Sequence, residues 1–537
     1  MYSGRRGVCE KIGPVERAVG MAVVLAVLAP APVRAVSGSA PAVVPALREW
    51  TPAAGGAGWS LRRDARIVLR HGEGTALRRE AATLAADLGA LTGHAVPVRA
   101  ARGTHARPGD VLLTLTARDA ALGDEGYSLR VGRALSVAAH TAAGVFDGGR
   151  TVLQLVRLGE AVPRGHARDW PRYPQRGLMV DDGRAFYPLD WLERRVRALA
   201  DLKLNVFHLH ISDDQGFRIQ SDTHPEAVTK PFLSKADVRA LVGYAARYHV
   251  TIVPEIDMPG HMTALLAKHP ELQLADALGQ RQPDKLDVTL PAARAFVGQL
   301  LDEYLPLFPG AYWHSGSDEY LGVASTPADY DRYPQLAAFA QAKYGASANG
   351  QDAVIDFANF VGERIRAAGK QQRVWSDGMT GGSAVELDHR AVVEWWENLH
   401  SLAPADLVAR GYRVFNVGWW PLYYVTGGPL VGLRSTPSDF FAEFEPWRFE
   451  GPYTPRWLGG PPAAQTVSPQ SPGVLGAGLA VWNDDPSAPG AQPDAVAAGI
   501  APRLRLLAQK TWGTKPDATD YASFERSAAA ASGPLTP

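Results

Sequence analysis

The chain has 537 residues with 46% hydrophobic content, so it can bury more than one core, and its length predicts roughly two or three domains. Lys and Arg balance Asp and Glu at 55 each, which argues against nucleic acid or another polyanion as a partner. The one cysteine, Cys9, lies near the N-terminus, so neither disulfides nor thiolate metal sites are expected in the rest of the chain.

Residues 1–35 are typical of a signal peptide. Four basic residues between Arg5 and Arg17 precede an apolar run at 18–29, and Val33-Arg34-Ala35 offers small residues at the cleavage positions. We expect cleavage after Ala35 and a secreted protein with no stable membrane anchor, because the run is shorter than the roughly 20 residues that span a bilayer. An uncleaved N-terminal anchor is the alternative.

Residues 40–170 predict a small α+β domain of short strands with one helix. The helix is expected at 75–91, where leucines and alanines recur at spacings of three and four. Strand patterns occur at 111–115, 127–131 and 135–138. This segment carries no cluster of acids, histidines or glycines that indicates chemistry.

Residues 171–512 alternate strand and helix patterns, which predicts the α/β class and a (β/α)8 TIM barrel, with 513–537 as a C-terminal tail. An open, doubly wound sheet is the alternative. One helix is expected to start at Ser234, with Asp237 completing a capping box. The eight strands are expected at 177–181, 205–210, 251–256, 312–316, 373–376, 392–395, 414–417 and 478–481.

Polar and aromatic residues follow these strands, where a barrel places its chemistry. Eight of the 14 tryptophans lie between Trp375 and Trp482, which predicts an aromatic wall on which apolar sugar faces stack. In strand order, the residues that follow are Asp181 and Arg184, Asp213 and Asp214, His261, Asp318 and Glu319, and then Trp375, Trp396, Trp420, Tyr424 and Trp482.

Asp318 and Glu319 form an adjacent acidic pair directly after a strand. Neighbouring residues in a strand face opposite ways, so both carboxylates can serve one site only where the pleat breaks, as the small residues Gly316 and Ser317 permit. Another such pair, Asp124-Glu125, is expected to be a solvated turn.

Histidines in or just after the second and third predicted strands are candidates for chemistry. His208 and His210 share one face of a strand, and without an evident third ligand we interpret them as hydrogen-bonding residues and predict no metal site. A Pro-Gly turn places His261 just beyond the next strand, where Asp213 could pair with it. A turn histidine without a chemical role is the alternative for His261.

Four strings from Pro174 to Trp482 resemble glycoside hydrolase family 20, the β-N-acetylhexosaminidases, in the family's order. The segment before them resembles that family's usual N-terminal domain. The strings are Arg176-Gly-Leu-Met-Val-Asp181 with Arg184, His-Leu-His-Ile-Ser-Asp-Asp-Gln-Gly-Phe-Arg218, Pro-Glu-Ile-Asp-Met-Pro-Gly-His261 and His-Ser-Gly-Ser-Asp-Glu319.

The resemblance implies a retaining mechanism in which the substrate's 2-acetamido oxygen is the nucleophile and gives an oxazolinium intermediate without a cofactor. Glu319 would be the acid and base and Asp318 would hold the acetamido group, with Asp213 and His261 behind them. Tyr424 would bond the acetamido oxygen and Arg176 the hydroxyls of the terminal sugar, whereas Trp375, Trp396 and Trp482 would enclose the ring.

The sequence departs from the family at two positions. Ser317 stands where glycine is usual, and Thr426 stands where many members have a sugar-binding aspartate, for which Asp484 could substitute. The substrate expected is an oligosaccharide or glycoconjugate with terminal β-linked N-acetylglucosamine or N-acetylgalactosamine. The alternatives are a lacto-N-biosidase that releases a disaccharide, a non-catalytic carbohydrate-binding protein, and a metal-dependent hydrolase.

Overall fold

A computed structural model describes residues 39–535 except 57, 71, 102–105, 116, 160, 323–324, 378–383, 398–400 and 450–464. The signal peptide expected at 1–35 therefore lies outside the described residues, as does Cys9. Within the described part of the chain, no helix combines the length and the apolar character needed to cross a membrane.

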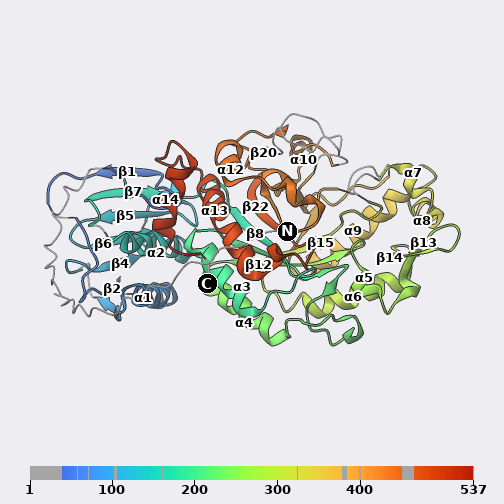
Figure 1. Cartoon of the computed structure of the whole chain (residues 1–537), viewed down its shortest axis with the longest axis horizontal. Helices are drawn as coiled ribbons and strands as arrows, with labels where there is room; N and C mark the ends of the chain where they lie inside the picture. The colour runs from blue at the N-terminus through green and yellow to red at the C-terminus, as the bar shows by residue number, and fades with distance from the viewer. Residues whose placement is uncertain are drawn as a thin grey trace, which may run out of the picture. The chain divides into compact units, whose positions relative to one another are not determined.

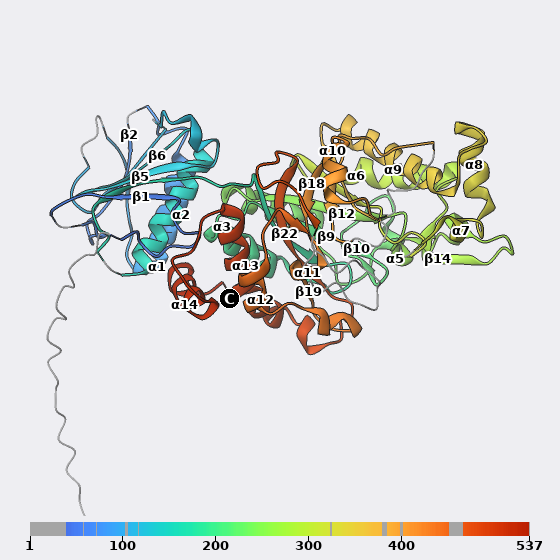
Figure 2. The same cartoon turned by 90° about the horizontal axis from the view of Figure 1, so that it is seen from above.

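The N-terminal domain is a seven-stranded sheet with two helices, α1 (Arg78–Thr92) and α2 (Ala142–Arg157). Both helices pack on one face of the sheet, which buries the apolar face predicted for α1 (Figure 2). In the sheet order β1-β7-β5-β6-β4-β2-β3, the strands are β1 (Glu49–Pro52), β7 (Gly165–Asp169), β5 (Tyr127–Val131), β6 (Leu135–Ala139), β4 (Val111–Thr114), β2 (Ile67–Arg70) and β3 (Val98–Ala101).

The helix α2 corrects the prediction of a single helix in this domain. Its sequence includes Gly144, Gly148 and Gly149, and glycine weakens a helix by about 1 kcal/mol relative to alanine, so the pattern did not indicate one. A Cβ atom at Gly148 would lie 2.3 Å from the Val137 side chain. The glycine thus lets the helix approach the sheet closely, and tertiary packing overrides the local propensity.

The second domain is a closed barrel of eight parallel strands (Figure 1). The pairing of β18 with β22 closes the ring, which confirms the barrel and excludes the open sheet. A ninth short strand, β19 (Tyr423–Val425), pairs with the end of β22. The barrel strands are β8 (Gln175–Asp181), β9 (Val206–His210), β12 (Thr251–Met258), β15 (Tyr312–Gly316), β16 (Gln371–Trp375), β17 (Val392–Trp395), β18 (Arg413–Asn416) and β22 (Val474–Trp482).

Helices follow the barrel strands, and α4 begins after the capping box of Ser234 and Asp237, as predicted. In chain order the helices are α3 (Leu189–Asp201), α4 (Lys235–Arg247), α5 (Thr263–Leu266), α6 (Pro291–Tyr304), α7 (Pro327–Tyr330), α8 (Pro334–Tyr344), α9 (Gly350–Ala367), α10 (Pro404–Ala409), α11 (Trp419–Leu422), α12 (Pro437–Glu443) and α13 (Pro493–Trp512). The C-terminal residues form α14 (Tyr521–Ser532), which contacts α2, α12 and α13.

Two excursions lengthen the loops after the third and fourth barrel strands. The first contains α5 and the hairpin β13 (Gln273–Ala275) and β14 (Arg281–Leu286), and the second contains α7 and α8; they lie together in Figures 1 and 2. The remaining short strands are β10 (Ser212–Asp213), β11 (Gly216–Phe217), β20 (Arg448–Phe449) and β21 (Gln465–Thr466).

Candidate active site

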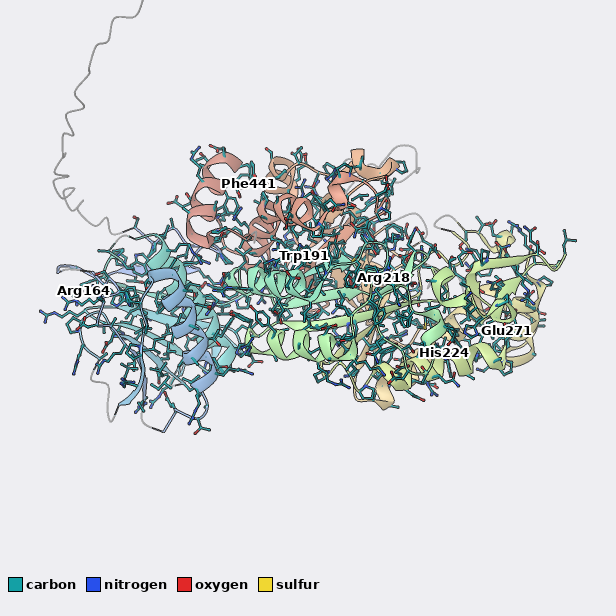
Figure 3. The ribbon with its side chains drawn as sticks, turned by 60° about the horizontal axis from the view of Figure 1, so that its bottom comes forward. Arg164, Trp191, Arg218, His224, Glu271 and Phe441 are labelled. Atoms are coloured by element: carbon teal, nitrogen blue, oxygen red, sulfur yellow. The ribbon has the colours of Figure 1, made fainter. Side chains whose placement is uncertain are left out.

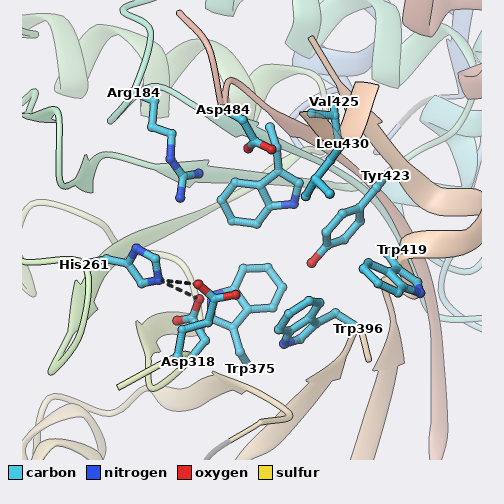
Figure 4. A pocket seen from close by; sticks show the side chains of 12 residues that line it. Arg184, His261, Asp318, Trp375, Trp396, Trp419, Tyr423, Val425, Leu430 and Asp484 are labelled. Carbon is cyan, nitrogen blue, oxygen red and sulfur yellow. Dashed lines mark ion pairs between the residues drawn. The ribbon is translucent and has the colours of Figure 1, made fainter. Parts of the chain in front are cut away.

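A cavity of about 420 Å³ lies at the carboxyl ends of the barrel strands. The acidic pair and His261 face aromatic side chains across it (Figure 4). This is the end of the fold at which barrels place their chemistry. The cavity is lined by Arg184, His261, Asp318, Glu319, Trp375, Trp396, Trp419, Tyr423, Val425, Leu430, Trp482 and Asp484.

The turn that carries the acidic pair has an unusual backbone. Gly316, Ser317 and Glu319 have φ angles of 67°, 81° and 48°, in the left-handed region that costs residues other than glycine about 1–3 kcal/mol each. A Cβ at Gly316 would also lie 1.6 Å from a carboxylate oxygen of Asp257. The pleat therefore breaks where the sequence predicted, and both carboxylates reach one cavity.

His261 lies between the acidic pair and a buried aspartate. Its Nε2 is 3.2 Å from Glu319 Oε2 and 3.6 Å from Asp318 Oδ2, and its Nδ1 is 3.4 Å from Asp213 Oδ1. Burial opposes the charged ring, but the carboxylates of Asp213, Glu319 and Asp318 outweigh it and raise the pKa of His261 well above its usual range. The ring is thus a cation at neutral pH.

Asp213 anchors this arrangement from below. It accepts a hydrogen bond from His210 Nε2 at 2.8 Å and pairs with Arg184 at 2.9 Å. Burial alone would raise the pKa of Asp213, but Arg184, His210 and His261 hold it well below the usual range. The chain Arg184, Asp213, His261 and Glu319 therefore fixes the position of the Glu319 carboxyl group.

Asp318 differs from Asp213 because it lacks a strong donor. Its Oδ1 is buried and has no hydrogen-bond partner among the described residues. Burial, followed by the nearby Asp257 carboxyl, raises the pKa of Asp318 well above its usual range. Burial also raises the pKa of Tyr423, so this phenol stays protonated and can donate into the cavity.

Two of the predicted tryptophans are fixed by carboxylates outside the cavity. Trp375 donates to Glu255 Oε1 at 2.7 Å, and Trp396 donates to Asp377 Oδ1 at 2.7 Å. Asp377 also accepts the backbone N–H of Glu319 at 2.8 Å. Asp377 was not among the residues predicted from the sequence, although its position just after β16 was a signal. It couples the aromatic wall to the acidic turn.

The cavity tyrosine is Tyr423, which corrects the assignment of Tyr424. Residues alternate along β19, so Tyr423 and Val425 face the cavity and Tyr424 faces away. The Tyr424 ring lies against Arg434 and Arg503 in the core outside the barrel. The position two residues after the cavity tyrosine is consequently Val425 and not Thr426.

The two neighbouring tryptophans differ in the same respect as the two tyrosines: Trp419 lines the cavity and Trp420 does not. Thr426 instead donates to Asn483 Oδ1 at 3.0 Å, in the buried region. Asp484 lies in the cavity, as the sequence suggested, and burial raises its pKa even though Arg184 opposes the shift.

The assignment of Arg176 to sugar binding is wrong. Arg176 lies at the start of β8, about 16 Å along the strand from Asp181 at the cavity end, at ~3.3 Å per residue. Its guanidinium is 1% exposed, bonds Glu125 at 2.8 and 2.9 Å and stacks on Trp512. The pair Asp124-Glu125 lies in a turn, as predicted, and Asp124 is exposed, but Glu125 is partly buried at the contact of the two domains.

The arginine that does line the cavity is Arg184, eight residues further along. It bonds Asp181 at 3.0 Å and lies over the Trp482 ring at 5.1 Å. Burial would lower its pKa, but Asp213 and Asp181 outweigh burial and raise it. The motif contained both arginines, and only the direction of β8 distinguishes their roles.

The histidines of β9 form a hydrogen-bonded network around Glu255. His208 Nε2 and His210 Nδ1 lie 2.9 and 2.5 Å from Glu255 Oε2, so the hydrogen-bonding interpretation is confirmed. The structure adds His314, whose Nδ1 is 2.9 Å from Glu255 Oε1. His208, Glu255 and His314 could also group around an ion, a cluster that the sequence spacing did not show.

This fold and site define a carbohydrate-active enzyme of the barrel type, and comparison with known families identifies the family. The model "Glycosyl hydrolase family 20, catalytic domain" matches residues 173–514, and "Glycosyl hydrolase family 20, domain 2" matches 40–170. The chain belongs to glycoside hydrolase family 20.

Its curated relatives include enzymes of two specificities. A lacto-N-biosidase of Bifidobacterium bifidum is 36% identical over 379 residues, which cover 70% of this chain and 32% of that protein. A β-N-acetylhexosaminidase of Cellulomonas fimi is 32% identical over 349 residues, which cover 61% of this chain and 63% of that protein. The chain thus spans about a third of the first relative and under two thirds of the second.

Solved structures agree in fold. The family 20 β-N-acetylhexosaminidase of Streptomyces coelicolor has a TM-score of 0.69 at 26% identity, covering 92% of this chain and 96% of that one. A mutant β-hexosaminidase of Streptomyces plicatus, in complex with the product N-acetylglucosamine, has the same score and identity and covers 92% of this chain and 97% of that one.

Proposed function

We propose that the protein is a retaining, exo-acting β-N-acetylhexosaminidase that hydrolyses terminal β-linked N-acetylglucosamine or N-acetylgalactosamine by substrate-assisted catalysis. The observation that carries the proposal is the placement of Asp318, Glu319 and Tyr423 around one aromatic cavity. Family membership supports it, because several relatives bear hexosaminidase names.

Each side chain has a defined task in this mechanism. Glu319 donates its proton to the glycosidic oxygen as the bond from that oxygen to the anomeric carbon breaks. The acetamido oxygen forms a new bond to the same carbon, and Tyr423 orients that oxygen through its hydroxyl. Water then attacks the anomeric carbon as its bond to the acetamido oxygen breaks, which regenerates the acetamido group. The water loses a proton to the Glu319 carboxylate, which restores the acid.

Asp318 must be ionised when it stabilises the oxazolinium, and burial, which raises its pKa, opposes that ionisation. Substrate reverses this balance in two ways. The acetamido N–H gives the unpaired Oδ1 the donor that it lacks, and the growing positive charge favours the carboxylate. We therefore place the ionisation of Asp318 after substrate binding.

The leaving group fits a second cavity, which shares only Glu319 and His261 with the first. Because the general acid separates the two cavities, the sugar that departs on the acid's side would enter the second. Its lining is largely polar and charged, which suits a hydrophilic saccharide. It comprises Asp214, His261, Gln282, Asp284, Lys285, Glu319, Leu321, Gly322, Asp329, Arg332 and Tyr333.

Lacto-N-biosidase activity is the second candidate, and the corrected cavity favours it at one point. Val425 and Leu430 line the cavity where the family pattern implied an aspartate, so a sugar hydroxyl loses a partner there. The identity to the Bifidobacterium bifidum lacto-N-biosidase points the same way. In a closed, single-sugar pocket, Arg184 and Asp484 would hold the hydroxyls of the terminal sugar, because both line the cavity.

Two experiments test the function. The purified protein is expected to hydrolyse a 4-nitrophenyl N-acetyl-β-glucosaminide, and a thiazoline mimic of the oxazolinium should bind far more tightly than N-acetylglucosamine. Inactivity on N-acetylhexosaminides and lacto-N-biosides alike would leave only a carbohydrate-binding protein. The first product decides which unit is released. A lacto-N-biosidase should release a disaccharide from intact lacto-N-tetraose. A β-N-acetylhexosaminidase should release a monosaccharide from lacto-N-tetraose whose outer galactose has been removed.

We also propose that the protein is secreted, on the signal pattern of residues 1–35. N-terminal sequencing of protein recovered from the culture medium tests this proposal. A chain that begins just after Ala35 is expected, and retention of the full N-terminus in a membrane fraction would indicate the anchor.

A further inference from the structure

Two turns of identical sequence meet outside the active site, one in the loop after β11 and the other in the excursion that contains α5. His224-Pro225-Glu226 and His269-Pro270-Glu271 each begin a single 3-10 turn, Pro225–Ala227 and Pro270–Leu272. The histidine in each turn has nearly the same backbone conformation, with φ of −132° and −127°. Figure 3 labels His224 and Glu271, one residue from each turn.

The two imidazole rings are held in place by helix α6. Phe296 packs against His224 and His269 at centroid distances of 4.4 and 5.0 Å, and the two rings meet edge to face at 5.6 Å. His224 is 8% exposed, and the side chain of His269 is 20% exposed. The rings are therefore fixed in orientation and still reached by solvent.

The outer nitrogen of each ring faces an oxygen that can only accept. His224 Nε2 is 2.9 Å from Gln299 Oε1, and His269 Nδ1 is 3.4 Å from Glu271 Oε1. The contact to Gln299 favours a ring proton on the outer nitrogen of His224, which leaves a lone pair on its inner nitrogen. Such outer partners are what metal-binding histidines typically have.

The inner nitrogens converge on one carboxylate oxygen. His224 Nδ1 and His269 Nε2 lie 3.1 and 2.9 Å from Glu226 Oε1, and the three atoms lie within 4.8 Å of one another. These three atoms are close enough together to share one cation. The alternative to a metal ion is a pair of hydrogen bonds that the two rings donate to Glu226.

We propose that His224, Glu226 and His269 bind one divalent transition-metal ion of the zinc class. Zinc bonds of about 2.0–2.2 Å place tetrahedral ligands ~3.3–3.5 Å apart, so the two contacts to Glu226 need to open by only a few tenths of an ångström. The exposed side of the site leaves the remaining position to water. Two histidines and a carboxylate are ligands of intermediate hardness, which disfavours calcium and magnesium.

The bound ion would cross-link two loops that the chain connects only through α4 and β12. The His224 loop follows β11, and the His269 turn lies between α5 and β13. Anything that binds the folded state alone stabilises it by mass action, so zinc should raise the midpoint of thermal unfolding. The site does not depend on the proposed hydrolase activity.

Calorimetric titration of the full chain with zinc chloride tests the proposal, alongside thermal unfolding with and without zinc. One saturating equivalent is expected, with a raised Tm. His269→Ala should weaken binding by at least 100-fold, and Gln299→Leu, which keeps all three ligands, by about 10-fold. Glu226→Gln keeps the shape of the site and should lose most of the zinc affinity. This variant still tests the proposal if His269→Ala folds poorly.

His389→Ala is the matched control. His389 is an exposed histidine that pairs with Glu386 at 3.1 Å and is not one of the three proposed ligands, so its loss should change neither affinity nor stoichiometry. The proposal is overturned if the wild-type chain shows no saturable binding. It is equally overturned if His269→Ala and Glu226→Gln bind zinc like the wild type, because the ion would then occupy another cluster.

Discussion

Replacing Arg176 by methionine should cost stability and leave substrate affinity unchanged. The guanidinium makes two hydrogen bonds to Glu125 and one each to the carbonyls of Tyr173 and Lys203, all at 2.8 to 2.9 Å. Breaking a buried ion pair costs about 3–5 kcal/mol. Because the Glu125 side chain is 21% exposed and recovers some hydration, we expect about 2–4 kcal/mol.

The assay compares Arg176→Met with Arg184→Met, the same substitution at the two ends of one motif. For Arg176→Met we expect a fall in Tm on the order of 5 °C and an unchanged KM at 25 °C. For Arg184→Met we expect kcat/KM to fall about 10–100-fold, since a charged hydrogen-bond donor leaves the cavity. A raised KM with an unchanged Tm in Arg176→Met would refute the placement of Arg176.

Three further outcomes follow from the site. Glu319→Gln should keep the fold and lose most turnover, with the larger loss on glycosides that have poor leaving groups; equal losses on activated and unactivated substrates would contradict the acid role. Tyr423→Phe should lower kcat/KM about 10–100-fold, and Tyr424→Phe less than about 2-fold, in parallel assays; the reverse order would restore Tyr424 to the cavity. Burial raises the pKa of Asp182 to about 8, so its ionisation costs stability as pH rises from about 4 to 8. Asp182→Asn keeps the acceptor for the Tyr187 N–H, and its Tm relative to the wild type should rise between pH 5 and pH 9; a constant difference would mean that the carboxyl titrates normally.

The sequence alone determined the class of fold. A buried parallel strand appears in the sequence as a short apolar run, and helical patterns on either side of that run distinguish it from a helix. All eight barrel strands lie where these runs predicted them, and closure of the ring confirms the barrel. The position of the acidic pair was also readable, since small residues mark the break in the pleat before Asp318. The strands and the break in the pleat are both set by residues that are close together in the sequence.

The residues that were assigned wrongly from the sequence are those whose role depends on the direction of a strand or on the face of a strand from which the side chain points. Tyr423 and Tyr424 are chemically identical neighbours, and only the pairing of β19 with β22 decides which one faces the cavity. Arg176 and Arg184 belong to one motif, and only the direction of β8 sends one to the domain contact and the other to the site.

Groups assembled from distant segments were beyond sequence reasoning altogether. Asp377 bonds both Trp396 and the backbone of Glu319, which lies 58 positions earlier in the chain. His224 and His269 come together only because two loops pack on the same face of α6. Local sequence patterns do not predict such contacts, because these contacts are stabilised by the burial of side chains from separate elements.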